Sequence, residues 1–408
     1  MNPNARMING PVNVIRLEGD VHGVKKILYL FLDYHVSVQN QTQCTNVFSE
    51  DVQKYFIDNF YKLNQGSKIY DFFAEIYPSE LAENKRTRFI DYKDKYIEEV
   101  IKIFKKLFRF DPKKNKVRIN ELFKNVRLHY LDIRDYYKHN IYFITADAVN
   151  IARKFMSNDN IDPQGLEMII HLLDVMEDHL SHTINVLSKR QTKKNRTPTI
   201  IREKNQDVDV ETLEYLANKI KNSYKHNDVR NKMLNLINES INNFKKTIQT
   251  IKSAITRFES YRKDIMATHD RLTKDPKSTY IYVYGLSSYS VREMIMDIMN
   301  TCELLVDDML VEFYARFTDI YFLRRFLDKD YITNAITYTG ALHSNTYVHF
   351  LVNEFNFKVT HASYSKIEDM RALTTEIKKR AVNMIQELIL PEWFGQCSSL
   401  KGFPEEFN

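Results

Sequence analysis

Two histidines and a glutamate stand at the ends of apolar runs that have the composition of buried β-strands. His35 follows the first run, Glu75 lies near the end of the second, and His343 follows a late one. A neutral imidazole can act as a general base or as a metal ligand, and a carboxylate can orient the ring or balance a cation. A carboxylate inside an apolar run also needs either an ion-pair partner or a chemical role. We therefore take these three residues as candidate catalytic residues.

Four neighbouring residues could help to bind a substrate. Asp33 lies two residues before His35, Gly340 lies three residues before His343, and Asp132 and Arg134 follow a third apolar run. An arginine at this place could hold an anionic group or stabilise a charged transition state. The alternative is that Asp132 and Arg134 form only a local salt-bridge network.

The reaction expected of such residues is hydrolysis, with water activated by an imidazole base. His35, Glu75 and His343 could also bind one divalent metal, such as Mn, Co or Zn, because imidazole and carboxylate groups are ligands of these ions. The residues alone do not decide between a metal-assisted and a metal-free site.

The elements that must position these residues follow an α/β pattern. Continuous apolar runs at 26–32 and 69–76 predict buried strands, and the segment between them has helical spacing from the predicted N-cap Ser49 to about residue 63. Such a strand–helix–strand order predicts a mostly parallel central sheet flanked by helices. Function in open parallel sheets collects at the carboxyl ends of the strands, where the candidate residues stand.

A large all-helical insertion interrupts this pattern. We predict a first half of the α/β domain at 1–145, the insertion at 146–272, and a second half with a C-terminal helix and tail at 273–408. Apolar residues from Ile237 to Phe258 recur at spacings of 3 and 4, which predicts long helices packed antiparallel. The polar, basic segment 189–204 is predicted to be a loop.

Later strands are expected at three places after the insertion, 280–284, 335–339 and 357–360, with a helix at 346–355 between the last two.

These motifs resemble one known superfamily. The order strand–Asp-X-His, strand–Glu and late strand–Gly-X-X-His is similar to that of erythromycin esterases, ChaN-like, TraB and Tiki proteins. The resemblance covers about residues 25–140 and 280–365, and implies a hydrolase site that is metal-dependent in some members and metal-independent in others. Leu32 stands where the pattern has glycine, whereas a literal Gly-X-X-His ends at His22. The bias toward Asn, Ile, Lys and Tyr resembles uncharacterised proteins of giant DNA viruses.

Composition excludes several other classes. The chain is 43% hydrophobic and 27% charged with a net charge of +6, as expected for a folded protein and not for a disordered one. It has no Walker A, Gly-X-Ser-X-Gly or His-Glu-X-X-His motif. The three cysteines are too few and too scattered for a disulfide framework or a zinc site, which favours a reducing compartment. We find no signal peptide and no membrane-spanning run, and expect an intracellular protein of the host cytoplasm or the virion.

The leading hypothesis is thus a hydrolase acting on a small molecule or a peptide. A second is a catalytically inactive viral interaction or virion protein that binds a protein partner through the helical insertion. A third is a nucleic-acid-associated protein that uses the basic loop 189–204, although alternation of basic and apolar residues at 102–109 indicates an ordinary solvated helix face. We expect no nucleic acid and no membrane among the partners of the leading hypothesis.

Overall fold

A computed structural model describes most of the chain, in the ranges 6–37, 44–76, 96–108, 110–111, 116–117, 120–133, 141–189, 213–274, 288–307, 315–393 and 395–408. The predicted strand 280–284 and nearly all of the predicted loop 189–204 lie outside these residues. The described part is mixed α/β, as predicted, with a sheet of six strands and many helices.

The central sheet has the order β10-β2-β3-β9-β5-β8. Its strands are β2 (Asn13–Val21), β3 (Val24–Asp33), β5 (Tyr70–Ala74), β8 (Val126–Tyr130), β9 (Asn334–Gly340) and β10 (Lys358–Ala362). The four strands β3, β9, β5 and β8 are parallel, while β2 pairs antiparallel with both β3 and β10. The carboxyl ends of β3, β9 and β5 therefore meet at one edge of the sheet.

Helices cover both faces of this sheet. On one face, Phe56 of α1 packs on Phe31 of β3, on Phe72 of β5 and on Phe104 of α2. Phe73 points to the opposite face because side chains alternate along a strand. There it contacts Phe322 of α8. The helices concerned are α1 (Val52–Lys62), α2 (Tyr96–Leu107), α8 (Arg316–Asp328), α9 (Ala341–Phe355) and α10 (Met370–Ile377).

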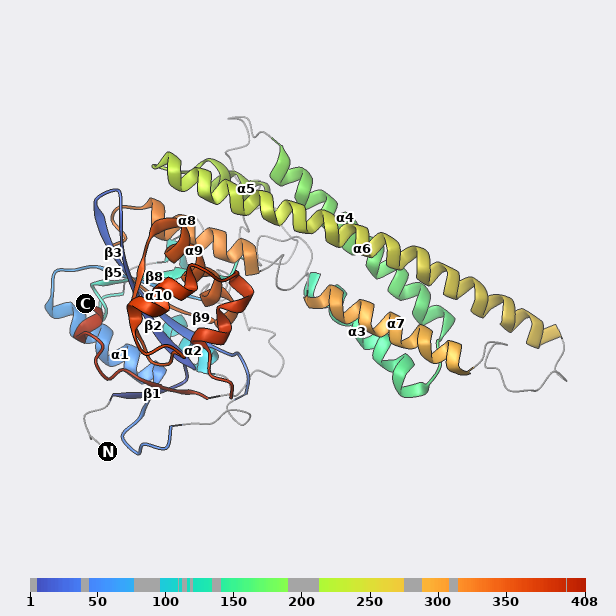
Figure 1. Ribbon diagram of the computed structural model, residues 1–408, viewed down its shortest axis with the longest axis horizontal. Helices are drawn as coiled ribbons and strands as arrows, with labels where there is room; N and C mark the ends of the chain where they lie inside the picture. The colour runs from blue at the N-terminus through green and yellow to red at the C-terminus, as the bar shows by residue number, and fades with distance from the viewer. Residues whose placement is uncertain are drawn as a thin grey trace.

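A long helical arm projects from the sheet domain (Figure 1). It contains α3 (Ile141–Asn158), α4 (Pro163–Ser188), α5 (Leu213–Asn222), α6 (Asn227–Lys274) and α7 (Ser288–Asp307). The helix pairs α4/α6 and α3/α7 pack closely along the arm. The apolar stripe of α6 is largely buried, including Ile237, Phe244, Ile248 and Phe258. The helix α7, which follows residue 272, lies beside α3 in the arm.

Smaller elements complete the domain. A second sheet has the order β11-β1-β4, and β6 pairs with β7. These elements and the remaining short helices are β1 (Met7–Asn9), β4 (Glu50–Asp51), β6 (Phe110–Asp111), β7 (Lys116–Val117), β11 (Cys397–Ser399) and α11 (Gln386–Ile389), with 3₁₀ turns at Leu63–Gln65, Val382–Met384 and Glu405–Phe407.

The cysteine prediction was wrong. Cys44 and Cys397 form a disulfide across 353 residues of sequence, with their Cα atoms 4.9 Å apart, and Cys302 is buried and free. The bond joins β11 to the segment that leads into β4. Two cysteines so far apart give no local spacing signal, which is why their pairing was not foreseen.

Two helix starts also differ from the prediction. Residues 50 and 51, expected as the acidic first turn of a helix, pair instead with β1 as β4, and α1 begins at Val52. The late helix begins at Ala341 and not at about 346, so His343 lies in its first turn. The antiparallel strand β2 was not predicted.

Across the described ranges, every helix is too short or too polar to cross a lipid bilayer.

Candidate active site

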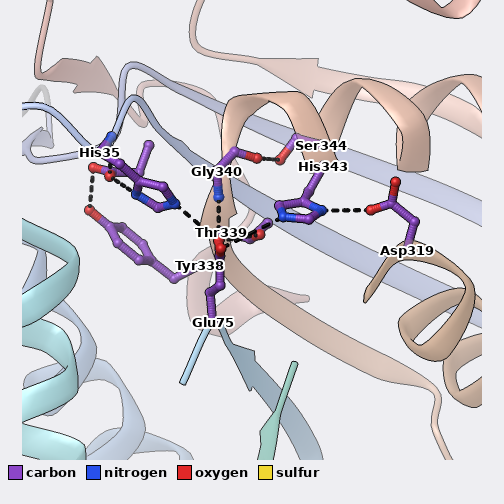
Figure 2. Close-up of polar contacts among 9 residues, drawn as sticks. His35, Glu75, Asp319, Tyr338, Thr339, Gly340, His343 and Ser344 are labelled. Atoms are coloured by element: carbon purple, nitrogen blue, oxygen red, sulfur yellow. Dashed lines mark hydrogen bonds and ion pairs between the residues drawn. The ribbon is translucent and has the colours of Figure 1, made fainter. Parts of the chain in front are cut away.

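Glu75 lies between two imidazoles at the carboxyl edge of the sheet (Figure 2). The Nε2 atom of His35 is 3.0 Å from Glu75 Oε2, and the Nε2 atom of His343 is 3.6 Å from Glu75 Oε1. His35 and Glu75 follow β3 and β5, and His343 follows β9, which lies between those two strands. The structure thus brings the three predicted residues together, although 268 residues separate Glu75 from His343.

Asp33 fixes the ring of His35. The Oδ2 atom of Asp33 is 2.5 Å from His35 Nδ1 and accepts a hydrogen bond of 2.7 Å from the His35 backbone N–H. The hydroxyl of Tyr338 in β9 donates to the other oxygen of Asp33 at 3.1 Å. His35 has a φ of 55°, in the left-handed region that a side-chain-bearing residue adopts only when its surroundings hold it there. Asp33 thereby contributes both to the backbone turn and to the ring orientation.

Asp319 fixes the ring of His343 as Asp33 fixes that of His35. Its Oδ1 atom is 2.7 Å from His343 Nδ1, and its side chain is buried within α8. A carboxylate on Nδ1 fixes the tautomer and directs Nε2 toward the centre of the site. Arg316, one turn earlier on α8, lies 3.8 Å from the second oxygen of Asp319. Each imidazole therefore has an aspartate on its outer side and Glu75 on its inner side.

The two oxygens of Glu75 are unequal. Oε2 accepts hydrogen bonds from the backbone N–H of Gly340 at 3.0 Å and from the hydroxyl of Thr339 at 3.1 Å, in addition to His35. Oε1 lies 3.6 Å from His343 Nε2, a distance beyond that of a good hydrogen bond. Oε2 is thus anchored to the start of α9, where the helix dipole favours a negative charge, and Oε1 is the oxygen that remains available.

Gly340 makes the close approach of the two rings to β9 feasible. A Cβ atom at this position would lie 3.0 Å from His35 Nε2 and 3.6 Å from His343 Cδ2. Its φ of −54° and ψ of 146° suit any residue. The glycine is required here for space and not for backbone conformation.

The opposite charges of Glu75 and of the two histidines stabilise one another. Burial opposes the charged form of His35, but the Glu75 carboxylate and the hydrogen bond with Asp33 outweigh it and raise the imidazole pKa to about 10. Burial likewise opposes the charge on His343, and Asp319 together with Glu75 raises its pKa to about 10. Burial would raise the pKa of Glu75, yet the two imidazoles hold it well below its usual value. At neutral pH the site holds two imidazoliums around an ionised glutamate.

The other residues predicted to bind a substrate lie in different places. Gly340 contacts Glu75 through its backbone N–H. Asp132 is buried directly after β8, the strand beside β5 at the edge of the sheet. Arg134 lies outside the described residues.

Sequence reasoning did not find Asp319, Tyr338 and Thr339. The available signal for Asp319 was a carboxylate directly before the apolar run Ile320–Leu323, in a helix where it proves to be buried.

Two further histidines pair with other carboxylates. His22, which ends the literal Gly-X-X-His, sits in the turn between β2 and β3 and pairs with Asp228 of the arm. It is at the opposite end of β3 from His35. His129 in β8 hydrogen-bonds Asp71, which also forms a two-point ion pair with Arg127. Burial lowers the pKa of His129 to about 4, so it is neutral and structural.

The donor set at Glu75 has the chemistry of a metal site, but not the spacing of one. Two Nε2 atoms and a carboxylate face one another, and both Nδ1 atoms are held by carboxylates, as is usual for metal-bound histidines. As the side chains lie, however, no group of three His, Cys, Asp or Glu residues in the described ranges could hold one metal ion. The histidines contact Glu75 itself, so an ion would have to separate them.

The chain belongs to a family of unknown function, DUF5847, whose model matches residues 6–408. Uncharacterised proteins of Acanthamoeba polyphaga mimivirus are similar over the whole chain. One is 55% identical over 413 residues, covering all of this chain and 98% of the relative, and another is 34% identical over 438 residues, covering all of this chain and 99% of the relative. No solved structure matches. The giant-virus resemblance agrees with these relatives, whereas none of the comparisons supports the erythromycin esterase and TraB resemblance.

Proposed function

We propose that this member of DUF5847 is a hydrolase whose Glu75 and His343 exchange protons with water and with the leaving group. The observation that carries the proposal is the placement of Glu75 between two imidazole Nε2 atoms, each ring being backed by an aspartate. Pairs of titratable groups with strongly shifted pKa values are a mark of functional sites. The substrate class we favour is an ester or amide of a small molecule or peptide.

The charge state suggests which group acts as the base. Because both imidazole pKa values are raised to about 10, the rings are protonated at neutral pH and cannot accept a proton. The carboxylate is ionised, and its Oε1 atom lies 3.6 Å from His343 Nε2, beyond a good hydrogen bond, so we assign this oxygen to the attacking water. The base is therefore Glu75, in place of the imidazole base expected from the sequence.

In the proposed reaction, Glu75 accepts one proton and His343 donates one. Water attacks the acyl carbon and gives a proton to Glu75 Oε1, while His343 Nε2 donates its proton to the leaving oxygen or nitrogen as the bond to carbon breaks. Transfer of a proton from Glu75 to His343, which are 3.6 Å apart, restores the starting state. His35 remains charged throughout and stabilises negative charge that develops on the substrate.

A metal-assisted version uses the same residues. His35, Glu75 and His343 would hold the ion, which would supply a Lewis acid and a bound water of lowered pKa. Asp33 and Asp319 would keep both Nε2 atoms turned toward it. Hydrolysis in the presence of a chelator and after addition of Mn, Co or Zn separates this version from the metal-free one.

The test is hydrolysis of a panel of nitrophenyl esters and peptide nitroanilides. Glu75→Gln should lower kcat/KM about 10²- to 10⁴-fold, since it removes the proton acceptor and retains the shape. Glu18→Gln is the matched control, because it makes the same change on β2, where Glu18 pairs with the buried Arg16 and the exposed Lys25. Equal rates for Glu75→Gln and wild type would refute the proposal. No hydrolysis by the wild type with or without metal would refute it as well.

The helical arm favours a second candidate, a viral protein that binds a partner. The arm extends far from the sheet domain, as Figure 1 shows. Large apolar side chains are exposed on it, including Met156, Met168 and Met296. A chain that is inactive on the panel yet retains a specific partner after Glu75→Gln would support this alternative.

A further inference from the structure

The helix α8 lies between the arm and the candidate active site. It is buried on nearly all sides, which is unusual for a helix at the surface of a sheet. Its residues divide into two stripes of helical spacing. One stripe contacts the arm and consists of Phe317, Tyr321, Arg324 and Asp328, of which Tyr321 also stacks on Tyr130 of β8. The other stripe contacts the sheet domain and consists of Asp319, Phe322 and Phe326.

The arm holds the first stripe along its whole length. Phe317 packs on Phe244 of α6, with ring centroids 5.9 Å apart. Arg324 donates a hydrogen bond of 2.9 Å to the backbone carbonyl of Ser223. At the end of the helix, Asp328 accepts hydrogen bonds from the backbone N–H groups of residues 225 and 226, at 2.7 and 2.9 Å. The base of the arm thus contacts α8 at its start, its middle and its end.

The second stripe faces the site. Asp319 hydrogen-bonds His343, and Phe322 packs on Phe73 of β5 and on Tyr347 of α9. At 100° per residue, the two stripes lie on opposite sides of the helix. A shift or rotation of α8 at the arm would therefore move Asp319 relative to His343. Hydrogen bonds of this kind weaken steeply with distance and angle.

We propose that the helical arm regulates the site through α8, by holding Asp319 in the position where it orients His343. Asp319 is then a positioning residue, and the packing of α6 on α8 decides whether the His343 ring keeps its orientation toward Glu75. A partner that binds the arm and alters this packing changes the activity. The inference rests on the proposed function only for its effect on rate, because the position of Asp319 can be measured without any substrate.

The test compares two identical changes on α6. Phe244→Ala removes the ring that contacts Phe317, whereas Phe258→Ala removes a buried ring 14 residues along the same helix, about 21 Å away. The His343 imidazole is followed by NMR titration of histidine-labelled protein and assigned with His343→Gln. Phe244→Ala should lower the His343 pKa by about one unit, a tenfold change in its protonation constant, and kcat/KM should fall with it. Phe258→Ala should leave both unchanged.

Two results would overturn the inference: an unchanged His343 titration in Phe244→Ala, or equal shifts in the two variants. If Phe244→Ala does not fold, the milder pair Phe244→Leu and Phe258→Leu gives the same comparison. A His343 shift in an otherwise inactive protein would support the coupling while refuting the proposed hydrolase. Activity that depends on Glu75, without a shift in the His343 titration, would support the hydrolase and refute the coupling.

Discussion

Replacing Gly340 by alanine should damage the site without straining the backbone. The backbone at this position is in an ordinary extended conformation, so alanine adopts it freely. The new methyl group, however, would lie 3.0 Å from His35 Nε2 and 3.4 Å from its Cδ2 atom. The ring must move away by a few tenths of an ångström, and the hydrogen bond of 3.0 Å between His35 and Glu75 must lengthen.

The size of the effect follows from two opposing contributions. A hydrogen bond between charged groups contributes about 1.5–3 kcal/mol. Because 32% of the His35 side chain is exposed, water compensates part of its loss. Alanine also reduces the freedom of the unfolded chain, which stabilises the protein by about 0.4–1 kcal/mol. We expect Gly340→Ala to lower the free energy of unfolding by about 1 kcal/mol and to lower the pKa of His35.

Urea unfolding and NMR titration of His35 measure the two effects. Gly66→Ala is the control, since Gly66 also has a negative φ and its Cβ would meet nothing closer than 3.7 Å. That variant should be as stable as the wild type or more so. If Gly340→Ala is equally stable and leaves the His35 titration unchanged, the steric argument is wrong.

Three further predictions concern stability. The pKa values of His35 and His343 are raised from 6.5 to about 10, so their contribution to stability should be complete below pH 6.5 and lost as the pH rises through about 10. Thermal unfolding measured across this pH range checks the prediction, and His343→Gln should reduce the change of melting temperature with pH. Cys44→Ser should lower the free energy of unfolding of the oxidised protein by about 2–4 kcal/mol, and reductant should abolish the difference from wild type. Ile248→Asp should destabilise the arm by about 3 kcal/mol or more, since it buries an unpaired carboxylate, whereas the exposed control Ser253→Asp should change the melting temperature little.

Part of the site could be predicted because its residues directly follow strands. Parallel strands place their carboxyl ends at one edge, so polar residues after apolar runs meet there. His35, Glu75 and His343 were found in this way. Asp319 could not be found by this rule, because it reaches the site from the side of a helix that has no fixed register with the strands.

The fold was predictable where the hydrophobic pattern is continuous. The fully buried runs of β3, β5 and β9 and the stripe of α6 have such patterns. The strand β2 includes Arg16, Glu18 and Asp20, and its polar residues obscure the pattern. In the structure Arg16 is buried and bonds Glu18 and Thr360, a partner 344 residues away. The disulfide escaped prediction for the same reason, since pairing across the whole chain leaves no trace in local sequence.

The position of β9 in the sheet has a consequence for how the protein is made. This strand fills the gap between β3 and β5, yet a ribosome synthesises it only after the entire arm. Until then, both neighbouring strands present unpaired edges, which are prone to aggregate with other nascent chains. Pairing across 264 residues of sequence with β5 and 307 with β3 also makes sheet closure slow. We therefore expect chains truncated before residue 334 to be insoluble, and full-length chains to benefit from chaperones during synthesis.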